Sequence, residues 1–214
     1  MPRRTRQLPS DSSKEETRDA ILRAAHHLFM SQGYHAVSTR QIADASGVTQ
    51  PALYHHFADK QDLYMAVLNM PFTSLRVTLE RIAQRNDTVE QRLIQAARFL
   101  VAQGGDYTSQ MFHDIDHVLP PNLRQQIHDR FATSVVTPLA AIFEYGIAQG
   151  ALRSHTAGGT DPHTAALLLL TMLQQLSDVL QITPPGVQRP RLTQAQQADL
   201  VVRVLLHGLA IPQE

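Results

Sequence analysis

The stretch of sequence that decides the fold is STRQIADASGVTQPALYHHFADK, which runs from Ser38 to Lys60. An S-x-x-Q capping box opens a first short helix, and Gly47 stands where that helix must end in a left-handed conformation. Thr49 can cap a second helix, and Pro51 is tolerated in its first turn, where no amide hydrogen is needed. The stretch therefore predicts a helix-turn-helix, which lays its second helix in the major groove of DNA.

The composition of the chain allows a substantial core but does not by itself indicate a nucleic-acid partner. The 214 residues, 43% of them hydrophobic, suffice for one large domain or for a small and a medium one. The formal net charge is zero, with eight Lys or Arg against six Asp or Glu in residues 1–60 and eleven against thirteen in the rest. The weak basic excess therefore lies at the amino-terminal end of the chain, which holds the helix-turn-helix.

What the sequence lacks excludes some classes of site and location. Without cysteine the chain has no disulfide framework, no thiolate nucleophile and no cysteine-based zinc or redox site. The amino terminus, MPRRTRQLPSDSSKEE, holds no apolar stretch and is not a secretory signal. The longest apolar run, 165–173, is too short to span a bilayer. We therefore expect a cytoplasmic protein with no membrane partner.

Helical periodicity and capping motifs predict that nearly all the remaining chain is also helical. Ile21, Ala25 and Phe29 share one face of a first helix. Pro138 lies inside a long helix, where we expect a kink or a break. The fold class is therefore all-α. The expected helices lie at about 13–32 with a Ser13/Glu16 capping box, about 60–70 ending at Pro71, about 88–102, about 121–149, about 162–182 and about 193–210.

The last two expected helices are apolar nearly all round. A helix of this kind must be buried on more than one side. Two of them at the carboxyl end suggest a four-helix interface between two copies of the chain, although two ordinary core helices are the alternative. The residues expected at such an interface are Leu167, Leu170, Gln174, Val201, Val204, Leu205 and Gly208.

The expected first helix, followed by TRQIADASGVTQPALYHHFADKQDLY, resembles the TetR/AcrR family of transcriptional repressors over about residues 14–70. The strongest part of the resemblance is LY-x-HF-x-x-K, from Leu53 to Lys60. The later segment GIAQGALR, residues 146–153, resembles the family's link into its penultimate helix.

The resemblance implies a homodimer without enzymatic activity or cofactor. A three-helix DNA-binding domain, 13–60, would follow a flexible arm, 1–12, and bind a palindromic operator. A larger helical domain, 61–214, would dimerise and hold a small-molecule effector. In this family the effector displaces the fourth helix and releases the DNA.

The residues expected to contact DNA surround the turn between the two short helices. Thr39 begins the first of them, where a hydroxyl and free amides can hold a phosphate, and Arg40 can reach a phosphate or a base edge. The first turn of the second helix should face base edges, with Gln50 able to bond adenine and the two residues after it able to contact a thymine methyl. The residues of this turn are Thr49, Gln50, Pro51 and Ala52.

Three more contacts are implied by the resemblance. Tyr54 and His56 match positions that usually contact phosphates, and Lys60 matches a recurrent backbone-binding lysine. Lys60 is one of only two lysines in the chain. His55 is left open between a phosphate contact and a solvated side chain, whereas Leu53 and Phe57 are expected to brace the second helix.

The effector-binding residues are less clearly marked. Family pockets lie among the middle helices, and Met and aromatic side chains suit an adaptable apolar pocket, so a hydrophobic effector is expected. Ordinary core positions are the alternative for each candidate. The candidates are Tyr107, Met111, Phe112, Ile115, Phe131 and Met172.

Two other features, a histidine pair and an arginine-rich arm, have a functional and an ordinary explanation. His113 and His117 lie four residues apart, as helical metal ligands do, but no spacing supplies a third ligand, so no metal is expected. The arm holds Arg3, Arg4 and Arg6, which can enter a minor groove or form a solvated tail. The alternatives to an effector-released repressor are an architectural DNA-binding protein without an effector and an enzyme, for which no catalytic spacing is found.

Overall fold

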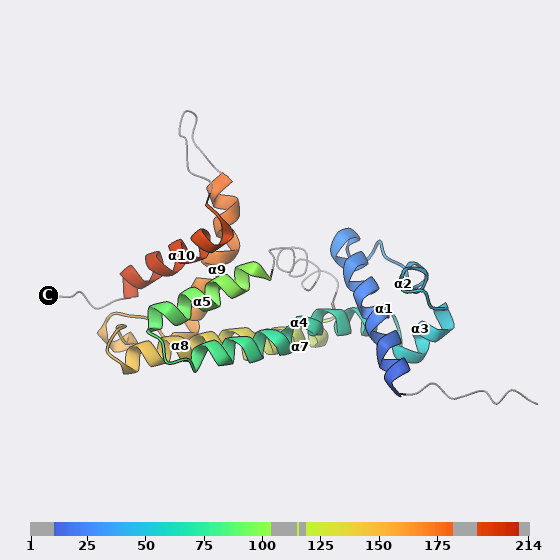
Figure 1. Ribbon diagram of the computed structural model, residues 1–214, viewed down its shortest axis with the longest axis horizontal. Coiled ribbons are helices and arrows are strands. Elements are labelled where there is room, and N and C mark those ends of the chain that lie inside the picture. The colour runs from blue at the N-terminus through green and yellow to red at the C-terminus, as the bar shows by residue number, and fades with distance from the viewer. Residues whose placement is uncertain (1–10, 104–114, 116–118, 182–191, 210–214) are drawn as a thin grey trace, which may run out of the picture. The chain divides into compact units, whose positions relative to one another are not determined.

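The computed structural model describes residues 11–103, 115, 119–181 and 192–209, and the elements in these residues are helices (Figure 1). The all-α prediction is confirmed. The chain divides into two compact units, residues 1–70 with 110–124, and residues 71–109 with 125–214.

The first unit contains α1 (Asp11–Gln32), α2 (Thr39–Ser46) and α3 (Gln50–His56). Helix α1 packs on α2, and α2 packs on α3. Helix α1 begins at Asp11, before Ser13, so Ser13 is not the N-cap that the sequence pattern predicted. The core of this unit is built from fully buried side chains of all three helices and of the start of α4: Ile21, Phe29, Ile42, Leu53, Leu63 and Tyr64.

The local signals of the helix-turn-helix are confirmed. The Ser38 side chain accepts the amide of Gln41, whose own side chain accepts the amide of Ser38 at 2.8 Å. Gly47 takes the left-handed conformation with φ of 72°. Thr49 caps α3 by accepting the amide of Ala52 at 3.3 Å. These bonds satisfy amides that the helix starts would otherwise leave unpaired.

Helix α4 (Lys60–Ala83) contradicts the prediction that it ends at Pro71. A proline removes one amide donor, which costs helical stability. Apolar residues nevertheless recur beyond it at helical spacing, and Phe72, Leu79 and Ile82 are buried. Burial of this face outweighs the missing hydrogen bond, so the helix continues for twelve more residues, to Ala83.

The second unit holds the larger core. Helix α5 (Val89–Ala102) packs on α8 (Thr137–Ala148) and on α10 (Gln194–Leu209), and α9 (Pro162–Gln181) packs on α8 and α10 (Figure 1). Capping boxes open two of these helices, Thr88 with Gln91 at α5 and Thr193 with Gln196 at α10.

Near Pro138, where a kink or a break was predicted, the chain stays helical but changes its helix type. Helix α7 (Pro121–Phe131) passes into a π-helical segment, Ala132–Val136, and Pro138 then lies in the first turn of α8, where its missing amide is tolerated. By length and composition alone Pro121–Ala148 is long and apolar enough to cross a membrane. Half of the most apolar 18-residue stretch of this helix is buried inside the protein, as in a core helix.

Candidate nucleic-acid interface

A buried hydroxyl joins the two helices of the helix-turn-helix. Thr39, at the start of α2, is 9% exposed, and its Oγ1 lies 3.1 Å from the Tyr54 hydroxyl of α3. The Gln50 amide, at the start of α3, donates to the same Oγ1 at 3.1 Å. Three of the residues predicted to contact DNA are therefore brought together within one hydrogen-bonded group, which fixes α3 against α2.

The other predicted contacts around the turn lie on its surface. Arg40, Thr49 and Pro51 are exposed, and Ala52 and His56 are half-buried. The exposed side chains offer a guanidinium, a hydroxyl and an apolar ring, which can meet phosphates, base edges and thymine methyl groups. Their contacts with DNA are predictions.

Leu53 and Phe57 have the bracing role that the sequence predicted. They are 0% and 2% exposed. The guanidinium of Arg18 in α1 lies 5.2 Å from the centroid of the Phe57 ring, which adds a contact between α1 and the end of α3.

Lys60 begins α4 and lies over an aromatic ring. Its Nζ is 4.2 Å from the centroid of Tyr34, a residue that the sequence analysis did not single out. Partial burial lowers the pKa of the Lys60 ammonium. Burial, and then the nearby charge of Asp59, raises the pKa of the Tyr34 phenol. No spacing rule relates residues 34 and 60, and the only sequence signal was an aromatic residue directly after a helix-ending glycine.

Three of the effector candidates lie among the described residues. Ile115 is fully buried, and Phe131 and Met172 are half-buried. Tyr107, Met111 and Phe112 lie outside the described residues, as do His113 and His117. Among the residues that are described, no three His, Asp or Glu side chains gather into a metal-binding group.

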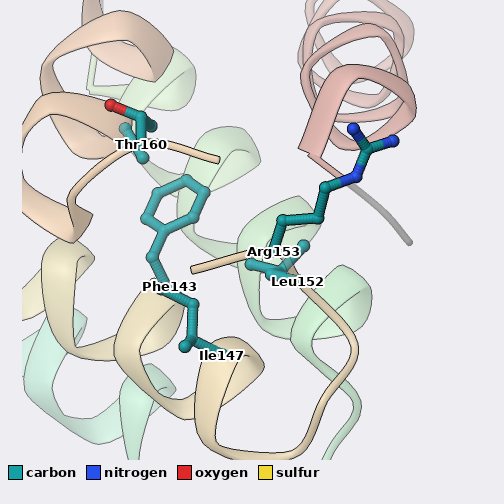
Figure 2. Close-up of a pocket in the computed structure, with 6 residues that line it drawn as sticks. Phe143, Ile147, Leu152, Arg153 and Thr160 are labelled. Carbon is teal, nitrogen blue, oxygen red and sulfur yellow. The ribbon is translucent and has the colours of Figure 1, made fainter. Parts of the chain in front are cut away.

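A small pocket opens elsewhere in the second unit (Figure 2). Its volume is about 10 Å³, and Phe143, Ile147 and Leu152 line it together with Arg153, Thr160 and Ala165. Pockets for drug-sized ligands usually measure about 300–1,000 Å³. This pocket is therefore too small for such an effector, and it includes none of the predicted effector residues.

The predicted interface residues of α9 and α10 differ in exposure. Leu167 and Val204 are 48% and 53% exposed, and Gln174 is also exposed, whereas Val201 and Leu205 are buried within their own chain. Leu170 is half-buried against the core. The side chains available to a partner are thus a subset of the predicted ones, joined by the exposed Leu168 and Leu200.

A buried arginine that the sequence analysis missed closes the end of α4. Arg92 of α5 is 6% exposed and donates to the carbonyls of Ala83 at 2.7 Å and Asp87 at 3.0 Å. Its guanidinium also lies 3.7 Å from the centroid of the Tyr145 ring. These contacts satisfy the last carbonyl of α4 and the carbonyl of Asp87 in the loop before α5, so the role of Arg92 is structural.

Comparison with known proteins identifies relatives of this chain. The sequence profile of the bacterial regulatory proteins of the tetR family matches residues 21–67. The HTH-type transcriptional activator FasR of Mycolicibacterium smegmatis is 34% identical over 158 residues, 72% of this chain and 68% of FasR. The HTH-type transcriptional repressor BepR of Brucella suis biovar 1 is 36% identical over 84 residues, 39% of this chain and 34% of BepR. The chain thus matches about a third of the length of BepR.

The similarity in fold extends beyond the profile. The solved structure of AibR in complex with isovaleryl coenzyme A and operator DNA has a TM-score of 0.63 and 26% identity to this chain. The superposition covers 88% of this chain and 97% of AibR.

Proposed function

Because this chain belongs to the TetR family of bacterial transcriptional regulators, we propose that it is a ligand-responsive repressor that binds a palindromic operator as a homodimer. The family is one of DNA-binding regulators and not of enzymes. In this proposal residues 13–60 bind DNA, and residues 61–214 bind the effector and dimerise.

The observation that carries the proposal is the hydrogen-bonded group of Thr39, Gln50 and Tyr54. It holds α3 in a fixed orientation on α2, with Arg40 and Pro51 exposed beside it. A recognition helix must be held in one orientation, because a small rotation of α3 would move every base contact at once. Thr39 and Tyr54 would hold phosphates, while Arg40 and the first turn of α3 would contact bases.

The exposed apolar side chains of α9 and α10 support the homodimer. Leu167 and Leu168 of α9 and Leu200 and Val204 of α10 are all more than a third exposed in the single chain. The two helices pack side by side, so these side chains are suited to bury one another in a symmetric four-helix contact. Two half-sites related by the same symmetry would then form the operator.

The response to an effector is supported by the likeness to AibR, whose structure holds both isovaleryl coenzyme A and operator DNA. We propose a small hydrophobic effector, with Phe131 and Met172 of the second unit as the described candidates for its contacts. Since α4 is one continuous helix from Lys60 to Ala83, it is the candidate element for coupling the effector to the DNA contacts. If the effector lowers the affinity for DNA by a given factor, DNA must lower the affinity for the effector by the same factor.

The proposal is tested by an electrophoretic shift assay on the DNA beside the chain's own gene. Arg40→Ala should weaken binding by about 1–3 kcal/mol and relax sequence choice at one base position. Lys60→Ala should weaken binding equally on all sequences and reduce the slope of log K against log salt by about one. Absence of sequence-preferring binding at moderate salt contradicts the proposal.

An activator is a second candidate, because FasR, the relative that matches 72% of this chain, is named as an activator. A reporter gene under the operator distinguishes the two. Deletion of the regulator should raise expression if it represses and lower expression if it activates.

A further inference from the structure

A lysine ammonium is held by an aromatic ring at the start of α4. The Nζ of Lys60 lies 4.2 Å from the centroid of the Tyr34 ring, within the range of a cation–π contact. In the described part of the chain no salt bridge involves Lys60. The neighbouring carboxylates accept backbone amides instead, Asp59 from Asp62 at 2.7 Å and Asp62 from Ala58 at 3.0 Å. The ring, and not a carboxylate, therefore holds this ammonium.

Tyr34 is in turn fixed by other aromatic rings of the first unit. It stacks on Phe29 with ring centroids 5.8 Å apart and lies 4.8 Å from Tyr64. Phe29 and Tyr64 are fully buried and meet edge to face at 4.9 Å. Such aromatic contacts favour a few defined geometries. The Tyr34 ring is therefore positioned by the core of the protein and does not depend on DNA.

This arrangement changes what a phosphate contact by Lys60 would require. A freely moving lysine loses rotamer freedom when it binds, which weakens binding by roughly 2- to 12-fold for one immobilised side chain. Lys60 is already partly ordered by the ring, and its partial burial lowers its pKa through loss of hydration. A cation that is already ordered and less hydrated loses less rotamer freedom and less hydration when it binds a phosphate.

We propose that Tyr34 is a positioning residue for DNA binding, whose ring holds the Lys60 ammonium ready for a backbone phosphate. The proposal rests on the proposed function, because it assumes that Lys60 contacts DNA. It adds a residue outside the helix-turn-helix whose effect on affinity should act through Lys60 and should not depend on the base sequence.

A double-mutant cycle tests this coupling. Operator affinity is measured by fluorescence anisotropy for the wild type, Tyr34→Leu, Lys60→Met and the double variant. Tyr34→Leu should weaken binding about 3- to 10-fold on specific and non-specific duplexes alike, but less than about twofold in the Lys60→Met background. Tyr34→Phe keeps the ring and should stay within about twofold of the wild type.

A second measurement tests the contact without DNA. The chain has two lysines, and the other one, Lys14, is exposed in α1. Lysine labelled with ¹³C at the ε position therefore gives two signals, one of which is an internal reference. The ε-methylene protons of Lys60 should lie upfield of those of Lys14 in the wild type and in Tyr34→Phe, and should lose that shift in Tyr34→Leu.

The outcomes separate the positioning role from the proposed function. If the protein binds its operator and Tyr34→Leu weakens binding equally in both lysine backgrounds, the positioning role is contradicted and the proposed function is not. The absence of an upfield Lys60 signal in the wild type likewise contradicts only the positioning role. A normal upfield signal without operator binding contradicts the proposed function. If circular dichroism shows that Tyr34→Leu does not fold, Tyr34→Met, which is unbranched and flexible enough to fill the space of the ring, replaces it in the cycle.

Discussion

The Thr39 hydroxyl is the shared partner of two residues that are predicted to contact DNA. Thr39→Val keeps the shape of the side chain but removes its bonds to Gln50 and Tyr54. We expect operator binding to weaken roughly 3- to 10-fold, from the loss of one or two hydrogen bonds that fix α3. Thr39→Ser, which keeps the hydroxyl, is the matched control in an anisotropy titration. Equal affinities of the valine and serine variants would show that the hydroxyl has no role.

Gly146, near the end of α8, is required by close packing. A Cβ atom at this position would lie 2.7 Å from Leu152 Cδ1 and 2.8 Å from Val89 Cγ2. Both of these neighbours are buried, so Gly146→Ala should lower the free energy of unfolding by about 1–3 kcal/mol. Denaturant unfolding measures the change. In the Leu152→Ala background the same substitution should cost much less, and an undiminished cost would contradict the packing argument.

Residues with local roles were predictable from the sequence, whereas residues with distant partners were not. The cap at Ser38, the left-handed Gly47 and the Thr49 cap depend on neighbours within four positions, so their spacing revealed them. Tyr34 meets Lys60 only because the turn after α1 lies at the start of α4, and Arg92 reaches back to the end of the preceding helix. No periodicity encodes such contacts.

At the scale of elements, one ion pair joins α5 to α10. Arg98 donates to both carboxylate oxygens of Asp199, at 2.7 and 2.6 Å. These hydrogen bonds lower the pKa of Asp199, so their contribution to stability is present above the ordinary aspartate pKa and is lost as the pH falls through the lowered value.

Asp199→Asn should therefore reduce the melting temperature at neutral pH by roughly 1–3 °C. The difference from the wild type should vanish in acid, where the carboxylate of the wild type is protonated as well. Thermal unfolding followed by circular dichroism between neutral and acidic pH measures this. A difference that persists unchanged in acid would mean that the carboxylate charge is not its cause.

The elements also show where sequence patterns fail. The prediction stopped α4 at Pro71 because a proline usually ends a helix, yet buried Phe72, Leu79 and Ile82 carry the helix on to Ala83. At Pro138, where a kink or a break was predicted, the chain also stays helical and changes only to a π-helical segment before the proline. At both prolines, tertiary packing outweighs the local tendency of proline to end a helix.

At the scale of the whole molecule, the proposed homodimer depends on the exposed apolar side chains of α9 and α10. Leu167→Glu combined with Val204→Glu would place two charges in that contact. We expect a monomer in light scattering after gel filtration, with operator affinity reduced at least tenfold because two half-sites are no longer linked. Val77→Glu is the matched control, since Val77 is 55% exposed but lies on α4. A dimer that survives the paired substitutions contradicts this interface.

The central claim, that a symmetric dimer binds two half-sites through α3, is tested most directly by hydroxyl-radical footprinting of the DNA beside the chain's own gene. We predict two protected regions related by two-fold symmetry, with centres one helical turn of about 10–10.5 base pairs, or a whole multiple of it, apart. Addition of the effector should remove both together. Protection scattered over many sites without symmetry would contradict the claim and favour an architectural DNA-binding protein.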